Sequence, residues 1–384
     1  MYGKPGGLLA ALLVATAFFA ASAYGVEQKS TILTAERIDE PITIDGVASE
    51  PAWSRATEFV TLAKDGSIGR VDVSLKALYD EDYIYLFVSW EDPTESVTKN
   101  LWTYNGTGWL SSGDEDRLSF IWNIDSSIEG FDIAGCAMLC HGDRMHTNGP
   151  EEKGDVWHWK ASRTNPAGYL DDQWMDDTII EDYTREALEA GHHNDEGAAA
   201  YRRNINEAGD GPRYFEPDPD DERDAYVLLQ SEIDAGEAVE LKEGDLEKGM
   251  VVPGYIIGEP SGSRADIIGR GVWKDGRWSV EFKRKLKTDH DDDVQFDTAR
   301  TYRFGIAIMD NTGGFEAFGK GHSFDLGART LEFGGRGSKE VVQLALIRDY
   351  LVSAKAYVNR GESGLALSTI SDALTIFNQI RDPM

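Results

Sequence analysis

The fold is decided by the stretch VDVSLKALYDEDYIYLFVSW, residues 71–90, in which polar and apolar side chains largely alternate. Side chains of a β-strand point to its two faces in turn, so the pattern predicts strands over residues 71–79 and 83–90. The acidic triplet Asp80-Glu81-Asp82 between them is typical of a hairpin turn. Further strand patterns cover residues 116–124, 278–282 and 302–309. We therefore predict a mainly β chain, folded as an antiparallel β-sandwich.

One long segment interrupts the strand pattern. Residues 171–259 are acidic and contain short helical patterns such as residues 181–190, and Pro217-Asp218-Pro219 breaks any regular element there. We predict that this segment is a partly helical insertion on one edge of a sandwich domain that spans residues 30–330. The insertion either covers a bound ligand or is a solvent-exposed segment without a binding role.

The end of the chain has a different periodicity. Apolar side chains recur at helical spacing over residues 338–359 and again over residues 364–380. The four residues Arg360-Gly361-Glu362-Ser363 separate the two runs. We therefore predict a C-terminal helical hairpin within residues 338–384, which packs on the sandwich or on a partner.

The first 25 residues predict the compartment of the protein. Lys4 precedes an apolar run over residues 8–20, and small residues follow at 21–25, which is the pattern of a signal peptide. This apolar run is short for a membrane span, and no later run reaches the length of one. We expect a mature protein that is exported to the periplasm and has no membrane span.

The chain is strongly acidic. Its 38 Lys and Arg residues stand against 68 Asp and Glu residues, which gives a formal net charge of −30. A field of this sign repels polyphosphate, so nucleic acid is not expected as a partner. The same field attracts a basic redox protein such as a cationic cytochrome, although solubility alone also accounts for the charge.

The chain's two cysteines lie in the motif GCAMLCH, residues 135–141. Two thiols can add to the two vinyl groups of a haem, and a histidine directly after the second thiol can reach the iron. The usual motif has two residues between the cysteines, whereas this chain has three. We predict one haem, attached covalently through Cys136 and Cys140 and ligated by His141. A disulfide between the two cysteines is the alternative.

Several segments resemble a known family. The segments at 42–46 (ITIDG), 50–53 (EPAW) and 76–86 (KALYDEDYIYL) resemble the opening of family 9 carbohydrate-binding modules and of the haem-binding subunit of ethylbenzene dehydrogenase. Met145, followed by 155–161 (DVWHWKA) and 276–286 (GRWSVEFKRKL), is similar to the haem-binding branch, which includes cytochrome c-552 and dimethyl sulfoxide reductase-like haem-binding domains. The resemblance extends over residues 34–327, apart from most of the insertion.

This resemblance implies a cofactor and a role. The family holds a single haem, ligated by a methionine and a lysine, and passes electrons for a molybdenum oxidoreductase. Met145 matches the methionine, and Lys283 is the candidate for the lysine. The family binds its haem without covalent attachment, so Cys136 and Cys140 depart from its pattern, and His141 competes with the lysine for the iron. A His/Met pair leaves no open position on the iron and suits electron transfer.

Two questions about ligands stay open in the sequence. Besides His141, the iron has four candidate ligands: Met145, His146, Lys283 and His322. The second question concerns His290-Asp291-Asp292-Asp293, whose carboxylates either bind calcium or form a solvated acidic turn.

The sequence carries no recognised catalytic motif, neither a nucleophile elbow nor a phosphate-binding glycine loop. We therefore predict an electron carrier or electron-transfer subunit rather than an enzyme. The alternative function is that of a secreted carbohydrate-binding module of family 9 type without haem, in which Trp102 and Trp109 would stack on sugar rings.

Overall fold

The computed structural model describes residues 32–66, 69–141, 144–180, 190–218, 226–312, 322–324 and 328–334, and in the tail 347, 350–351, 354–355, 358 and 363–381. The signal peptide predicted over residues 1–25 lies outside the described residues, as does most of the helical piece predicted over residues 181–190. In the described part of the chain, no helix has both the length and the apolar character needed to cross a membrane.

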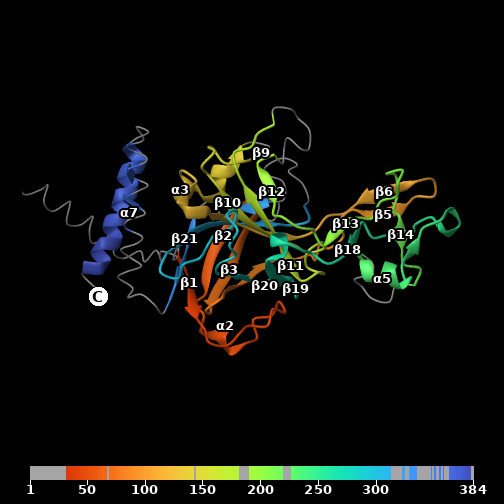
Figure 1. Cartoon of the computed structure of the whole chain (residues 1–384), viewed down its shortest axis with the longest axis horizontal. Helices are drawn as coiled ribbons and strands as arrows, with labels where there is room; N and C mark the ends of the chain where they lie inside the picture. The colour runs from red at the N-terminus through yellow and green to blue at the C-terminus, as the bar shows by residue number, and fades with distance from the viewer. Residues whose placement is uncertain are drawn as a thin grey trace, which may run out of the picture. The chain divides into compact units, whose positions relative to one another are not determined.

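Ten strands of the described chain form a closed antiparallel ring, because β7 pairs with β21 and so joins the two ends of the sheet. Around the ring the strands are β21 (Tyr302–Met309), β22 (His322–Phe324), β2 (Phe59–Gly66), β3 (Gly69–Tyr79), β4 (Tyr83–Glu91), β20 (Arg277–Lys285), β19 (Ile267–Lys274), β11 (Tyr169–Met175), β10 (Gly154–Lys160) and β7 (Arg117–Asn123). Figure 1 labels β2, β3, β10, β11, β19, β20 and β21 of this ring. The mainly β prediction is confirmed, and the antiparallel sheet is closed as in a barrel.

The hairpin of β3 and β4 forms where the alternating pattern predicted it. Asp80 makes the turn, since its Oδ1 accepts hydrogen bonds from the backbone N–H groups of Asp82 (2.8 Å) and Tyr83 (2.7 Å). Val73 and Leu75 are fully buried and point into the barrel, while Asp72 on the other face is exposed. The local turn chemistry and the strand period therefore specify the same register.

Aromatic rings fill the interior of the barrel. The Trp159 and Trp278 rings lie 4.9 Å apart between centroids, and Trp122 and Trp157 are equally close. Each is at most 1% exposed. A ring buried in this way stabilises the fold by about 2 kcal/mol. The main hydrophobic core therefore fills the inside of the barrel.

Two of the smaller apolar clusters cover outer faces of the barrel. One covers the outer faces of β7, β10 and β21, which we call the cysteine wall because Cys136 packs there. The other covers the outer faces of β3, β4 and β20, which we call the lysine wall because Lys283 lies there. Helix α2 (Pro51–Arg55) packs on the lysine wall through Trp53, while β1 (Ile32–Arg37) pairs with β23 (Arg329–Phe333) and β3.

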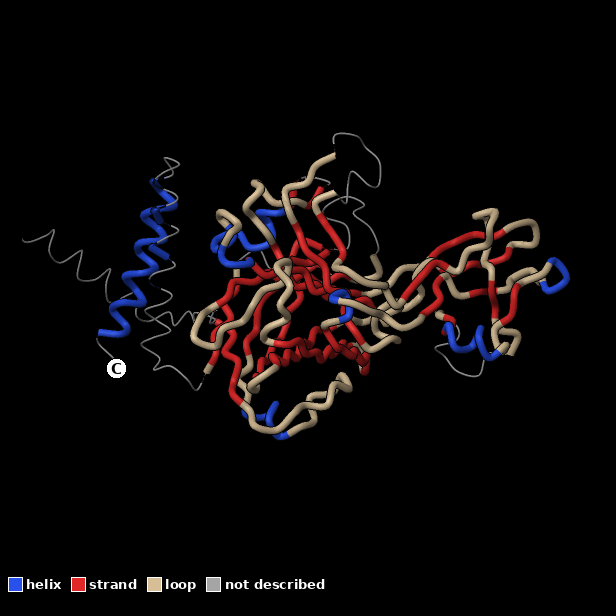
Figure 2. The backbone as a smooth tube through the Cα atoms, in the orientation of Figure 1, coloured by secondary structure: helices blue, strands red, loops and turns tan. Residues whose placement is uncertain are grey.

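The insertion is built mainly from short strands, which Figure 2 shows grouped together beside the barrel. The structure places residues 171–175 in the barrel strand β11, so the insertion begins after β12 (His192–Asn194) rather than at residue 171. The hairpin of β5 (Leu101–Tyr104) and β6 (Trp109–Ser112) belongs to the same unit, because β5 pairs with β17 (Val251–Val252). The remaining elements are β13 (Tyr201–Arg203), β14 (Tyr214–Phe215), β15 (Leu228–Leu229), α5 (Gln230–Ala235), β16 (Val239–Glu240) and β18 (Tyr255–Ile257).

The tail contains helix α7 (Ser363–Arg381), close to the range of residues 364–380 expected from the sequence. The described residues between 347 and 358 are also helical. Ala366 and Ala373 of α7 are buried, whereas Leu367 and Leu374 are more than half exposed. Helix α7 therefore buries its small side chains and leaves large apolar ones at the surface.

Candidate functional site

The motif with the two cysteines folds as a compact loop on the cysteine wall. Helix α3 (Phe131–Ala134) ends at Gly135, whose backbone angles (φ 55°, ψ −141°) are readily accessible only to glycine. The turn η2 (Gly135–Leu139) follows, and then the strands β8 (Cys140–His141) and β9 (Arg144–Met145). The sharp reversal at Gly135 brings Cys136 against the barrel.

Cys136 is 5% exposed and lies in an apolar cluster. Its closest approach to the barrel is at Gly305 of β21, where an added Cβ would lie 3.1 Å from the Cβ of Cys136. A side chain at position 305 would push the loop outward, so glycine permits this contact. The cluster consists of Ile121, Ile128, Phe131, Cys136, Leu139, Val156, Met175 and Ala328, with Met138 and Met145 packed against it.

The hairpin of β8 and β9 brings the other predicted site residues to the same place. Cys140 pairs with Met145, and His141 pairs with Arg144. The backbone N–H of His146 donates to the carbonyl oxygen of Leu139 at 3.1 Å, which closes the loop. Cys136, Cys140, His141 and Met145 are therefore held within one loop on one wall of the barrel.

Lys283 is on the other wall. It pairs with Tyr85 in the register of β20 and β4, and its Nζ lies 4.9 Å from the centre of the Tyr83 ring. Both tyrosines belong to the cluster around α2, on the side of the barrel away from α3 and β9 (Figure 1). The structure does not bring Lys283 together with the other predicted ligands. His322 lies in β22 opposite Met309.

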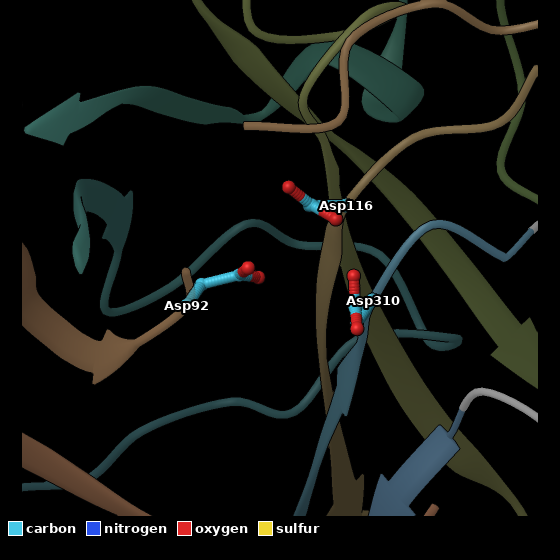
Figure 3. A group of neighbouring side chains, drawn as sticks. All are labelled: Asp92, Asp116 and Asp310. Atoms are coloured by element: carbon cyan, nitrogen blue, oxygen red, sulfur yellow. The ribbon is translucent and has the colours of Figure 1, made fainter. Parts of the chain in front are cut away.

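Three carboxyl groups meet at the barrel mouth where β4 and β21 end and β7 begins, which we call the Asp116 mouth. Figure 3 shows Asp92, Asp116 and Asp310 converging from three chain segments. Asp116 accepts hydrogen bonds from the backbone N–H groups of Ser96 (2.7 Å) and Asn311 (2.9 Å) and from Trp278 Nε1 (2.9 Å). Burial nevertheless raises the pKa of Asp116 to about 7.

A second acidic group lies at the opposite mouth, which we call the Arg284 mouth. The Arg284 Nη1 donates to Asp155 Oδ2 at 2.5 Å, and both side chains are fully buried. Asp172 and Asp293 lie beside Asp155, with carboxylate oxygens of all three within 4.8 Å of one another. Asp155 is in phase with Trp157, and Arg284 with Phe282, so both charges point into the barrel.

A buried ion network joins the insertion to the barrel. Asp171 of β11 forms ion pairs with Lys160 and, at 3.1 Å, with Arg264, and Tyr201 Oη donates to it at 2.6 Å. Burial acts to raise the pKa of Asp171, but the charges of Lys160 and Arg264 outweigh it and lower the pKa well below its ordinary value. This network links the insertion to the barrel, because each of its buried charges has an oppositely charged partner.

The family model described as Ethylbenzene dehydrogenase matches residues 50–317 of the chain. The chain belongs to the ethylbenzene dehydrogenase family. This confirms the family resemblance over residues 50–317, within the range of residues 34–327 expected from the sequence. No curated protein matches the chain.

Two solved structures to which this member of the ethylbenzene dehydrogenase family is similar are described as carbohydrate-binding proteins. A family 9 carbohydrate-binding module from Caldicellulosiruptor kristjanssonii in complex with glucose has a TM-score of 0.32 and 7% identity, covering 80% of this chain and 97% of its own. A putative carbohydrate-binding protein from Bacteroides uniformis ATCC 8492 has a TM-score of 0.31 and 9% identity, covering 79% of this chain and 98% of its own.

The tryptophans expected to stack on sugar are packed within the insertion of this family member. Trp102 is 6% exposed, and its Nε1 donates to the carbonyl oxygen of Asn204 at 2.8 Å. The Arg203 guanidinium covers its ring at 5.2 Å. Trp109 is half-buried and packs against Tyr104, with ring centroids 5.2 Å apart. Trp102 therefore does not offer a free face to a sugar.

The interior of the barrel is filled by aromatic rings, so a porphyrin has no room among them. The cysteine wall, in contrast, gathers the thiol of Cys136 and the thioether side chains of Met138 and Met145 in one apolar cluster. Sulfur donors beside an apolar surface suit both attachment and ligation of haem.

Proposed function

We propose that this member of the ethylbenzene dehydrogenase family is an exported electron-transfer protein that carries one haem on the cysteine wall. The observation that supports the proposal is the folding of Cys136, Cys140, His141 and Met145 into a single loop in a chain of this family. A bound haem would supply one-electron redox chemistry, and the chain would attach it, ligate it and shield it from water.

The predicted site residues have different roles in holding the haem. Cys136 and Cys140 would hold the haem through thioether bonds, and His141 would ligate its iron. Met145, His146 and His322 are the candidates for the other axial position. Lys283 is left out, because it lies on the lysine wall with the barrel between it and Cys136. A thioether ligand opposite an imidazole favours Fe(II) and raises the potential.

The partner is a redox protein that tolerates or matches a strongly acidic surface. The net charge of −30 favours a basic cytochrome, and the family favours a molybdenum oxidoreductase. The signal peptide predicted over residues 1–25 places the encounter in the periplasm. Electron exchange with a basic cytochrome should slow steeply as salt is added, because the attraction between the two proteins is screened.

The test is production of the full chain in a periplasm that contains machinery for covalent haem attachment. We expect red protein whose Soret band stays with the polypeptide in acid acetone. The double variant Cys136→Ser/Cys140→Ser should allow the pigment to be extracted or lost, whereas each single variant keeps one thioether bond and should shift the absorption bands. Lys283→Gln, on the other wall, is the matched control and should leave the spectrum unchanged.

Two outcomes would contradict the proposal. Colourless, unmodified protein from such cells would remove the haem. Loss of the pigment in Lys283→Gln but not in the cysteine variants would place a haem on the lysine wall instead. Met145→Ala then identifies the second ligand, since a changed potential and new carbon monoxide binding are expected only if Met145 ligates the iron.

A further inference from the structure

The Arg284 mouth contains more buried carboxyl groups than the guanidinium of Arg284 can pair with. Asp155, Asp172, Asp195 and Asp293 are each at most 4% exposed, and Asp292 is half-buried beside them. They come from β10, β11, the segment after β12, and the loop of residues 288–295 that follows β20. Segments distant in the sequence therefore converge on one small volume.

The spacing of these carboxylates matches a calcium ion. Oxygen atoms of Asp155, Asp172 and Asp293 lie within 4.8 Å of one another, and so do oxygen atoms of Asp195, Asp292 and Asp293. Two oxygens bound to one Ca²⁺ at about 2.4 Å can be at most about 4.8 Å apart. Each group by itself meets this limit, and Asp293 belongs to both.

Three of these carboxyl groups have no hydrogen-bond donor among the described residues. Both carboxylate oxygens of Asp172, Asp195 and Asp293 are buried without such a partner. The contrast with Asp116 is direct, because both oxygens of that residue accept hydrogen bonds. A buried carboxylate without a donor is strongly destabilising, and a cation removes that cost.

Arg284 does not fill this role. Its Nη1 donates to Asp155 and its Nη2 to the carbonyl oxygen of Val294, so the guanidinium is committed to one side of the mouth. Asp293 Oδ1 is 3.8 Å from Nη1, beyond hydrogen-bond distance. Asp172, Asp195 and Asp293 are therefore left without a cationic hydrogen-bond donor among the described residues.

The loop that supplies Asp292 and Asp293 is held in place by its own contacts. Gln295 Nε2 donates to Thr288 Oγ1 at 2.7 Å and to the carbonyl oxygen of His290 at 2.9 Å. Asp293 also lines a shallow surface depression with Gln295 and Lys287, which gives an ion a path from solvent. The site is thus pre-formed and reachable.

We propose that the Arg284 mouth binds Ca²⁺ through the carboxylates of Asp195, Asp292 and Asp293, whose oxygen atoms lie within 4.8 Å of one another. Calcium is the expected ion because it accepts six to eight oxygen ligands in irregular geometry, whereas Mg²⁺ requires near-octahedral geometry and keeps its waters. The ion ties the segment after β12 to the 288–295 loop at one end of the barrel. Of the two sequence interpretations of Asp291-Asp292-Asp293, calcium binding is the one that a buried Asp293 favours.

The test uses the full mature chain, stripped with EDTA and titrated with CaCl₂ by equilibrium dialysis and thermal unfolding. We expect one bound Ca²⁺ per chain and a rise in Tm on the order of 5 °C at saturation. Mg²⁺ at the same concentration should bind at least tenfold more weakly. Absence of binding at millimolar Ca²⁺, or equal affinity for Mg²⁺, would overturn the proposal.

Variants distinguish a specific Ca²⁺ site from non-specific binding to the acidic surface. Asp195→Asn should weaken Ca²⁺ binding at least tenfold. Asp293→Asn should do the same, which keeps the test valid if Asp195→Asn fails to fold. Asp291→Asn is the matched control in the same loop, where the side chain is 98% exposed, and should leave the affinity unchanged. A loss in Asp291→Asn as large as that in Asp195→Asn would mean that Ca²⁺ binds only to a solvated acidic surface.

Discussion

The two mouths of the barrel both bury aspartates, but they treat them differently. At the Asp116 mouth, backbone N–H groups and an indole N–H donate to the central carboxylate. At the Arg284 mouth, aspartate meets aspartate, and Arg284 donates to only one of them. A buried carboxylate is stable where hydrogen-bond donors surround it, and it needs a bound cation where such donors are lacking.

The largest effect is expected from Arg284→Met. This change leaves Asp155 buried beside Asp172 and Asp293 with no positive charge, and breaking a buried ion pair in this way costs about 4 kcal/mol of unfolding free energy. Urea unfolding of the calcium-free protein measures it. Arg277→Met, at the exposed end of the same strand, is the control and should change stability by less than about 0.5 kcal/mol. Equal effects would mean that the Arg284 mouth has no special charge deficit.

A loss of about 3 kcal/mol is expected from Asp116→Ala. The change leaves three donors at the Asp116 mouth without an acceptor, at about 1 kcal/mol each. The unfolding free energy checks this value. Asp310→Ala, in the same cluster but half-exposed, should cost far less. If both substitutions cost the same, hydrogen bonding does not explain the stability of this mouth.

The Arg284 mouth should make the unfolding free energy decrease as the pH rises. Burial raises the pKa of Asp195 to about 8 from an ordinary value of 3.8, so the folded protein keeps a proton that the unfolded chain releases. Stability therefore falls as pH rises from about 4 to about 8, by at most about 1.4 kcal/mol per pH unit for this proton.

Unfolding of EDTA-treated protein at pH 6 and pH 8 measures this slope. Asp195→Asn should reduce it, saturating Ca²⁺ should flatten it, and Asp291→Asn should leave it unchanged. A slope that is the same in Asp195→Asn and in the parent protein would show that Asp195 is ionised in the folded state throughout this range.

The smallest effect is expected from Gln295→Ala, which loosens the loop of residues 288–295 without changing its charge. Loss of the hydrogen bonds to Thr288 and His290 should lower the unfolding free energy by about 1 kcal/mol and weaken Ca²⁺ binding several-fold. Calcium titration of this variant checks both effects. An unchanged affinity would mean that the loop is held by the ion and not by Gln295.

The sequence predicted the β-class well because alternation is a local signal. The strands at residues 71–79 and 83–90 became β3 and β4 almost without change. The joining of β5 and β6 to the insertion was not predicted, because the pairing of Val252 with Trp102 depends on contacts across a large sequence separation. Closure of the ring through β7 and β21 escaped prediction for the same reason.

The candidate sites were predictable only in part. The spacing of Cys136, Cys140, His141 and Met145 was sufficient to group them, since they are neighbours in the chain. Lys283 was assigned to the same site from family resemblance, and the structure places it on the other wall. The carboxyl clusters had a sequence signal that went unused: Asp155 is in phase with Trp157 and Trp159, where an inward-pointing apolar residue is expected.

The ring of strands has a consequence for how the molecule is made. The strands that close it, β21 and β22, come from residues 302–324, whereas their neighbours β7 and β2 are complete before residue 124. A chain that emerges N-terminus first therefore leaves the edges of β2 and β7 unpaired while nearly 180 further residues follow, for roughly 10 s or more if it emerges at the rate of synthesis. Edges of that kind recruit other chains, so this protein should depend on holdase chaperones until its last barrel strands arrive.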